Sequence, residues 1–165
     1  MKKANAVMTV AMFLLFCGPA VALAANMPDF SGSYTLKSVK GEDSPGPGDA
    51  LSLQIAQTDA EIKITTVTDG VPTTATFSLK NNGECSGSNS GDSKCSAQWN
   101  GKSLDLETVY TAHPTENGPD VEMHTRERLQ LSSDKNTLTI KTETKAPQYP
   151  ALEMAPATTE VYTRY

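Results

Sequence analysis

The feature that most constrains the fold is a two-residue alternation of apolar and polar side chains, repeated along the chain after residue 30. Leu51, Leu53 and Ile55, for example, alternate with serine and glutamine. Such a pattern turns one face of a β-strand toward a core and the other toward water. No run with helical spacing exceeds a turn or two in this part of the chain. The chain is therefore predicted to be all-β, with strands at 32–40, 50–57, 61–68, 71–79, 95–100, 103–112, 121–132, 137–145 and 158–164.

Short connections between these segments indicate how the strands pair. Asp69-Gly70 and Asn100-Gly101 are strong hairpin signals, because a type I′ turn needs positive φ at both central positions. Strands joined by short loops usually pair with their neighbours in sequence. The prediction is a single antiparallel up-and-down barrel of about eight to nine strands.

The first 24 residues have the layout of a secretory signal peptide. "MKKANAVMTVAMFLLFCGPAVALAAN" begins with two lysines, continues with an apolar run and reaches a small-residue site that ends at Ala24. We expect cleavage after Ala24, which leaves a barrel domain at 25–165 in the periplasm or outside the cell. An uncleaved anchor is disfavoured, because the apolar run is shorter than the ~20 residues of a spanning helix. A lipoprotein attached through Cys17 is also disfavoured, because Phe16 stands where lipoprotein signals carry a small residue.

Charge excludes several classes of partner. Without residues 1–24 the chain has 12 basic and 19 acidic side chains, a net charge of about −7. An acidic surface repels nucleic acid and anionic membranes. A domain of this length buries a core by itself. We therefore expect a monomer that binds no nucleic acid and has no stable membrane insertion after signal cleavage.

Two cysteines remain after signal cleavage, Cys85 and Cys95. In an exported protein, a lone pair ten positions apart is most simply a disulfide that closes a small loop. Its expected contribution to stability is roughly 2–3 kcal/mol in the chain-entropy picture. A redox-active pair is the alternative, disfavoured because the CxxC spacing is absent.

Three longer connections, 41–50, 113–121 and 146–157, contain prolines and are expected at the ends or edges of the barrel. The last one carries Tyr149, Leu152 and Met154, which are too apolar for a solvated loop. We expect these side chains to cap one end of the core, with a lid over a ligand pocket as the alternative.

The stretch "DFSGSYTLK" at 29–37 resembles the start of the calycins, the superfamily of lipocalins and fatty-acid-binding proteins. In that superfamily a Gly-x-Trp opens the first strand, and an Arg or Lys of the last strand packs over the ring. Gly32-Ser33-Tyr34 stands at the opening here, and Arg164 stands in "VYTRY". The resemblance implies a structural closure pair, Tyr34 and Arg164, worth roughly 0.5–2 kcal/mol as a cation–π contact.

The chain also resembles exported bacterial domains that begin like "DLSGTW" and continue through "WDGxxL", "RxxLSxDGxxLT" and "VYxR". It has "WNGKSL" at 99–104, "RLQLSSDKNTLTI" at 128–140 and "VYTR" at 161–164. Tyr34 replaces the tryptophan of that pattern, and Lys135 stands at its turn glycine. This resemblance implies a lipocalin-like barrel and no particular activity.

Catalytic and metal motifs are weak, and we predict no enzyme, no cofactor and no metal site. "SGDSK" around Ser93 and "YTAHP" around His113 resemble pieces of a trypsin-like serine protease, but their order is wrong and the chain is too short for two barrels. Glu122 and His124 share a strand face and could bind a metal weakly. A solvated polar face is the simpler interpretation.

The strongest sign of an interior site is the use of threonine. On the apolar face of several strands, isoleucine and leucine give way to a polar set, which comprises Thr66, Thr68, Thr108, Tyr110, Thr142 and Thr144. A barrel interior that becomes polar along its length can hold water or a small amphipathic ligand. Threonine also simply suits strands. When nine strands are counted in sequence, the threonines do not all lie at one end, so no single polar mouth is predicted.

One charged residue falls on an apolar strand face. In segment 121–132 the alternation puts Glu127 on the side of Leu129 and Leu131, where an unpaired carboxylate is costly to bury. A position at a strand end, where the side chain reaches water, is the favoured interpretation. A ligand-binding carboxylate is the alternative.

The leading hypothesis is that the barrel binds a small, partly apolar ligand, hydrophobic or amphipathic, in its interior. The rival hypothesis is a protein-binding module, such as an envelope protease inhibitor, that acts through surface loops or the N-terminal "NMPDF". The candidate lining residues are Trp99, Thr108, Tyr110, Tyr149 and Met154.

Overall fold

The protein is an antiparallel β-structure throughout the part that the computed structural model describes, which is residues 27–41, 51–80, 85–86 (backbone only), 93–113, 119–150 and 156–165. The all-β prediction is confirmed. No helix that could cross a membrane occurs in these residues. The strands are β1 Gly32–Lys40, β2 Ser52–Gln57, β3 Glu61–Thr68, β4 Val71–Ser78, β5 Cys85–Ser86, β6 Lys94–Asn100, β7 Ser103–Ala112, β8 Val121–Leu131, β9 Thr137–Lys145 and β10 Thr158–Arg164.

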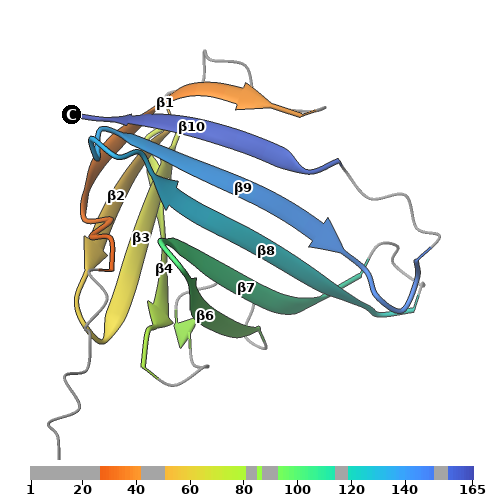
Figure 1. Cartoon of the computed structure of the whole chain (residues 1–165). Coiled ribbons are helices and arrows are strands. Elements are labelled where there is room, and N and C mark those ends of the chain that lie inside the picture. The colour runs from red at the N-terminus through yellow and green to blue at the C-terminus, as the bar shows by residue number, and fades with distance from the viewer. Residues whose placement is uncertain (1–26, 42–50, 81–84, 87–92, 114–118, 151–155) are drawn as a thin grey trace, which may run out of the picture.

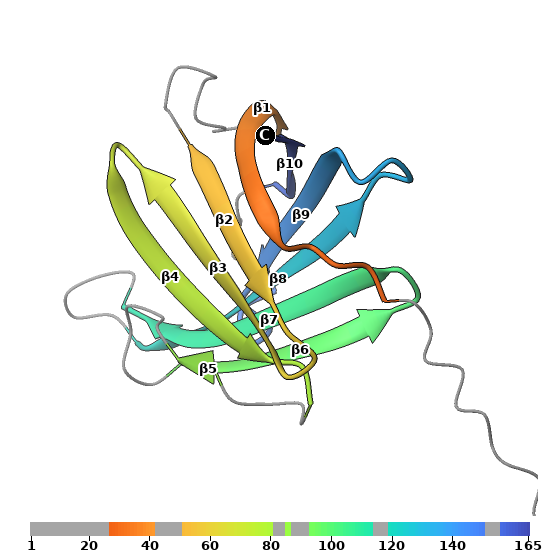
Figure 2. The ribbon, with the colours of Figure 1, turned by 90° about the vertical axis from the view of Figure 1, so that its left-hand side faces the viewer.

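The strands form one sheet that curves into a nearly closed up-and-down barrel (Figures 1 and 2). The strand order is β5-β4-β3-β2-β1-β10-β9-β8-β7-β6, so the first long strand pairs with the last. At the ends of the sheet, β4 and β6 contact each other. Figure 2 shows β5 and β6 side by side at this seam. The predicted barrel of sequentially paired strands is thus confirmed.

The two-residue strand β5 lies outside the nine predicted segments, and it corrects the strand directions. With nine strands, segment 61–68 runs opposite to 103–112 and 137–145. With β5 included, these segments are β3, β7 and β9, which the antiparallel ladders orient in the same direction. Their threonine-rich ends therefore lie at one end of the barrel, where β8 and β10 begin. The ends of β7 and β9 are at the right in Figure 1.

A hydrophobic core fills the other half of the interior, where β3, β7 and β9 begin. Each large side chain buried there stabilises the fold by roughly 1.5–3 kcal/mol relative to an exposed position. We call this region the packed half. It consists of Phe30, Tyr34, Leu53, Ile55, Ile62, Phe77, Ala97, Leu104, Leu106, Leu129, Leu138, Ile140 and Tyr162.

Of the two predicted two-residue turns, one forms at the expected residues and the other is shifted by one residue. Asp69 and Gly70 have φ of 51° and 78°, as a type I′ turn requires. Asn100 pairs with Ser103, so the next hairpin turns at Gly101-Lys102 rather than at Asn100-Gly101. Only Gly101 has positive φ there, 62°, which is the pattern of a type II′ turn. Lys135 adopts φ of 60° at the position where the exported domains carry glycine.

Arg164 and Tyr34 lie against each other where β10 meets β1. The guanidinium carbon is 5.2 Å from the centre of the Tyr34 ring. Arg164 Nη2 donates to the Ser31 carbonyl at 2.6 Å and to Tyr34 Oη at 2.8 Å. A Cβ on Gly32 would lie 2.9 Å from Arg164 Nε, so glycine leaves room for the guanidinium.

The predicted disulfide falls at the seam of the barrel. Cys95 takes part in a disulfide, whereas the side chain of Cys85 lies outside the described residues, so the Cys85–Cys95 pairing stays a prediction. The backbone of Cys85 pairs with β4 and that of Cys95 with β7. A bond between them would therefore join the two ends of the sheet.

Candidate ligand site in the barrel interior

The remaining interior differs from the core in composition and in exposure. Residues that pair directly across antiparallel strands point to the same side of the sheet, so the ladders carry the inward face from the core onto a second set of side chains. Each of these side chains keeps part of its surface accessible. We call this set the polar half. It consists of Thr66, Thr108, Tyr110, Met123, Thr125, Glu127, Thr142, Thr144, Thr158 and Glu160.

Hydroxyl groups in this half pair with one another across the strands. Thr125 and Thr144 are direct partners on β8 and β9, with their Oγ1 atoms 3.1 Å apart. Thr108 pairs with Thr125 from β7, so three threonines form a row across neighbouring strands. The row is polar, neutral and able both to donate and to accept hydrogen bonds.

Glu127 lies deeper in the barrel than this row. It points inward between its cross-strand partners, Leu106 on β7 and Thr142 on β9. Burial raises the pKa of its carboxyl, as does the charge of Glu160 to a smaller extent. The favoured expectation of a strand-end carboxylate in water is therefore wrong, because Glu127 sits in the middle of β8.

The Glu127 carboxylate has no hydrogen bond and no ion pair with any of the described residues. It nevertheless keeps some accessible surface. Because its side chain points inward, that surface faces the inside of the barrel. An inward carboxyl group with free hydrogen-bonding capacity is unusual in a packed core.

A second carboxylate shares the same space. Glu160 of β10 pairs with Ile140, a residue of the packed half, and so faces inward as well. Tyr162 donates its hydroxyl to Glu160 Oε2 at 2.7 Å. Burial, followed by this hydrogen bond, raises the pKa of Tyr162, which also responds to the charge of Glu127. We refer to Glu127 and Glu160 as the interior acidic pair.

Glu160 and Tyr162 escape the sequence prediction, although a signal for them exists. In β10 the residues two apart share a face. Once Arg164 is expected to pack over Tyr34, the same face of the strand carries Tyr162 and Glu160. The closure pair therefore also identifies the residues that point inward from the last strand.

The predicted lining residues divide between the two halves. Thr108 and Tyr110 belong to the polar half. Trp99 packs against the core and stacks on Phe30, with the ring centres 6.0 Å apart and the planes at 21°. Tyr149 follows β9 with 41% of its surface exposed, and Met154 lies outside the described residues. Of the five predicted lining residues, the structure thus places two in the polar half, which also contains the interior acidic pair.

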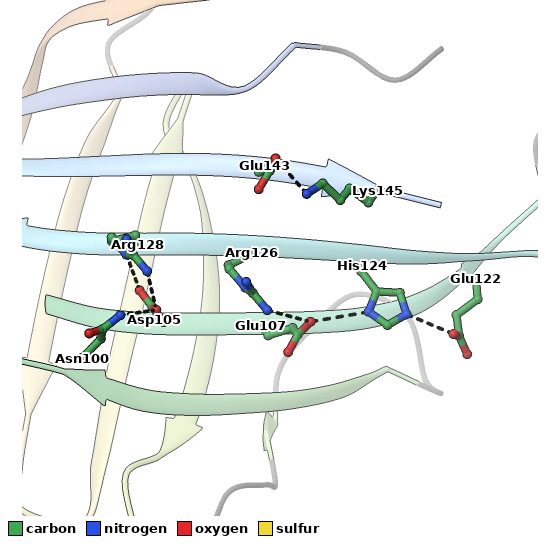
Figure 3. A network of polar contacts seen from close by, with 9 residues as sticks. All are labelled: Asn100, Asp105, Glu107, Glu122, His124, Arg126, Arg128, Glu143 and Lys145. Atoms are coloured by element: carbon green, nitrogen blue, oxygen red, sulfur yellow. Dashed lines mark hydrogen bonds and ion pairs between the residues drawn. The ribbon is translucent and has the colours of Figure 1, made fainter. Parts of the chain in front are cut away.

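The outer face of β7, β8 and β9 carries a different, ion-paired set of charges (Figure 3). His124 Nε2 lies 3.0 Å from Glu122 Oε1, and its Nδ1 lies 3.4 Å from Glu107 Oε1. Arg126 reaches the same Glu107 oxygen at 3.7 Å. The hydrogen bond to Glu122 raises the pKa of His124 most, with a smaller contribution from Glu107. Neither these residues nor any other described group of three or more His, Cys, Asp or Glu side chains is arranged so that it could hold a metal ion.

Comparison with known proteins gives a fold class. No protein-family model and no curated protein matches the chain. Among solved structures, the chain is similar to a REP1-NXSQ fatty acid transporter at 13% identity and to a mutant of the fluorescent protein UnaG at 13%, each with a TM-score of 0.55 and 82% of this chain and 96% of the other covered. Apo lipid binding protein 8 of Caenorhabditis elegans follows at 7% identity and a TM-score of 0.53, with 82% and 95% covered. The fold is therefore that of the calycin-type, lipocalin-like barrels, as the residues around Tyr34 and Arg164 predicted.

Proposed function

We propose that this protein is an exported, non-enzymatic barrel that binds a small, partly apolar molecule in the polar half of its interior. The main support is the contrast within one set of strands. A buried apolar floor is followed by inward hydroxyl and carboxylate groups that keep accessible surface. Apolar walls with a few convergent polar groups are the usual composition of small-molecule sites.

The structural neighbours add an argument by analogy. Two of them are named for fatty acid transport and for lipid binding. A shared fold at 7–13% identity does not carry function by itself. The proposal therefore depends on the inward residues of this chain, and the neighbours only make a ligand in the interior a reasonable use of the fold.

Export is the second part of the proposal and depends on the N-terminal sequence. We infer cleavage after Ala24, a location in the periplasm or outside the cell, and a mature domain that begins at residue 25. The predicted Cys85–Cys95 bridge fits an oxidising compartment. Intact mass of the protein from the exported fraction tests all three: we expect a chain that starts at Ala25 and weighs two daltons less than its reduced form. A mass that retains residues 1–24, or a lipid on Cys17, would contradict this.

The test of the ligand site is native mass spectrometry of the mature protein purified from the exported fraction of its own host. We expect a small molecule that is lost on denaturation. Thr108→Phe places a ring in the polar half and should abolish the adduct. Thr111→Phe is the matched control, because Thr111 lies on the same strand and is exposed. An adduct that survives in Thr108→Phe, or a bare protein that binds no member of a broad amphiphile panel, would overturn the proposal.

The protein-binding hypothesis has no specific observation in its favour. The N-terminal segment that it would use is tied to β2 through Gln57, whose Oε1 accepts from the Phe30 amide and whose Nε2 donates to the Pro28 carbonyl, each at 3.0 Å. Phe30 itself is buried in the core. A segment held in this way presents less surface to a protease than a free one does.

A further inference from the structure

The charges inside the barrel define which kind of ligand head group would be accepted. Glu127 on β8 and Glu160 on β10 are inward carboxylates on the two sides of β9, and the charge of Glu160 contributes to the raised pKa of Glu127. Between them, β9 contributes the neutral Thr142 and the apolar Ile140. The other acidic side chains on the inward faces of the neighbouring strands are the phenols Tyr34, Tyr110 and Tyr162.

No cation faces this pair within the described residues. All the lysines there are exposed, as are Arg126 and Arg128 on the outer face of β8. Arg164 is the one less exposed residue among the described lysines and arginines, and its Nη2 donates to Ser31 and to Tyr34 at the closure of the barrel. His124 is partly buried as well, but it lies on the outer face with Glu107 and Glu122. A ligand carboxylate in the polar half would therefore meet two like charges and no positive partner.

The carboxylate oxygens of the interior acidic pair also have hydrogen-bonding capacity that the described residues do not use, which favours a ligand with N–H donors. Glu127 has no partner among the described residues, and Glu160 uses Oε2 for Tyr162 and has no described partner for Oε1. A buried carboxylate is stabilised by a cation or by N–H donors, and it is costly without them. The packed half supplies an apolar surface next to these oxygens, because Glu127 and Glu160 pair with Leu106 and Ile140.

We propose that the interior site accepts an organic cation with an apolar part, such as an alkyl- or arylammonium, with its positive head bound by Glu127 and Glu160. The proposal rests on the proposed function, since it names the ligand class of the same site. It separates this protein from a carrier of fatty acid anions, even though the fold is shared with a protein named for fatty acid transport. The apolar tail would lie against the packed half, and the threonine row would contact the part of the ligand nearer the mouth.

The experiment compares three probes of equal chain length on the mature protein: octylammonium, octanoate and octan-1-ol. Titration calorimetry at pH 7.5 is expected to give at least ten-fold tighter binding of octylammonium than of octanoate, with octan-1-ol between them. Raising the pH from 5 to 8 is expected to strengthen octylammonium binding, because ionised carboxylates bind the cation and protonated ones do not.

Three variants locate the effect. Glu127→Gln should weaken octylammonium binding at least ten-fold and leave octan-1-ol unchanged, and Glu160→Gln should act in the same direction. Glu122→Gln is the matched control on the same strand, because Glu122 is exposed on the outer face and pairs with His124. Unchanged binding in Glu122→Gln excludes attraction by the acidic surface alone.

Failure of this inference differs from failure of the proposed function. If octanoate or octan-1-ol binds as tightly as octylammonium and Thr108→Phe abolishes that binding, the interior site stands and the cation preference is overturned. If octylammonium binding is unaffected by Glu127→Gln and weakened by Glu122→Gln, the cation sits on the surface and the inference fails. If none of the three probes binds, both proposals fail.

Discussion

The packed half and the polar half of the barrel are built from the same strands, yet they differ in nearly every side chain. Along β8, Leu129 is fully buried, whereas Glu127 and Thr125, two and four residues away on the same face, keep accessible surface. The backbone ladder is continuous through both halves. The comparison teaches that the ladder does not distinguish a core from a site. The inward side chains alone decide which half is a packed core and which half keeps accessible polar surface.

The largest test of this comparison exchanges one residue of each half on β8. Leu129→Ala should lower the free energy of unfolding by about 2–5 kcal/mol, because it leaves a cavity in a close-packed region. Thr125→Ala should lower it by about 1 kcal/mol or less, because the lost hydrogen bond to Thr144 has water as a substitute. Urea denaturation of both variants gives the two values. Equal losses would mean that the polar half is packed as tightly as the core.

The next test concerns the seam between the two ends of the sheet. Cys95→Ser should lower the free energy of unfolding by roughly 2–3 kcal/mol if the bond closes the short loop to Cys85. The same loss should follow when the wild-type protein is unfolded under reducing conditions, and the reductant should then have no further effect on Cys95→Ser. If the reductant does not change the stability of the wild-type protein, the prediction of a stabilising Cys85–Cys95 disulfide is wrong.

The closure between β1 and β10 is expected to contribute less. Arg164→Met keeps the apolar stem and removes the hydrogen bonds to Ser31 and Tyr34, which should lower the free energy of unfolding by about 1–3 kcal/mol. Arg128→Met is the control, because Arg128 pairs with Asp105 on the surface, where such pairs contribute about 0–1 kcal/mol. Thermal denaturation of both variants is sufficient. An equal effect of the two would place the closure pair among ordinary surface contacts.

The sequence predicts the strands and their apolar faces, but it does not predict where the polar half lies. Alternation within a strand is a local property, so nine strands and the apolar face of each follow from residue order alone. The end of the barrel at which Thr66 and Thr108 lie depends on the number of strands between them. That number changes with β5, whose two residues are too few to form a pattern. A prediction with nine strands therefore does not bring the threonines together at one end of the barrel, although it identifies each of them as inward-facing.

The depth of Glu127 is hidden for a related reason. Its face follows from Leu129 two residues away, but its height in the barrel depends on the ladders that connect β8 to β7 and β9. The same holds for Trp99, which the ladders put opposite Leu104 in the packed half. The height of an inward side chain along the barrel depends on the register of all the strands around it. That register depends on contacts between residues far apart in sequence.

The smallest expected effect has the opposite sign and concerns Glu127 itself. Burial raises the pKa of this carboxyl in the folded protein. The folded state therefore holds the proton more tightly than the unfolded state, and stability falls as the pH rises from the unfolded pKa to the folded one. Glu127→Gln removes this loss, so in ligand-free protein it should raise the free energy of unfolding at pH 7.5 by about 1 kcal/mol, with little change at pH 4. The gain is modest because the amide is itself a polar group without a partner.

Urea denaturation at the two pH values checks this prediction, with Glu122→Gln as the control on the exposed face of the same strand. We expect the control to show no such pH-dependent gain. If Glu127→Gln is destabilising at pH 7.5, the carboxylate is already satisfied in the folded protein. The polar half would then be a completed network rather than a site that awaits a positive head group, so this one sign distinguishes a second kind of core from a binding site.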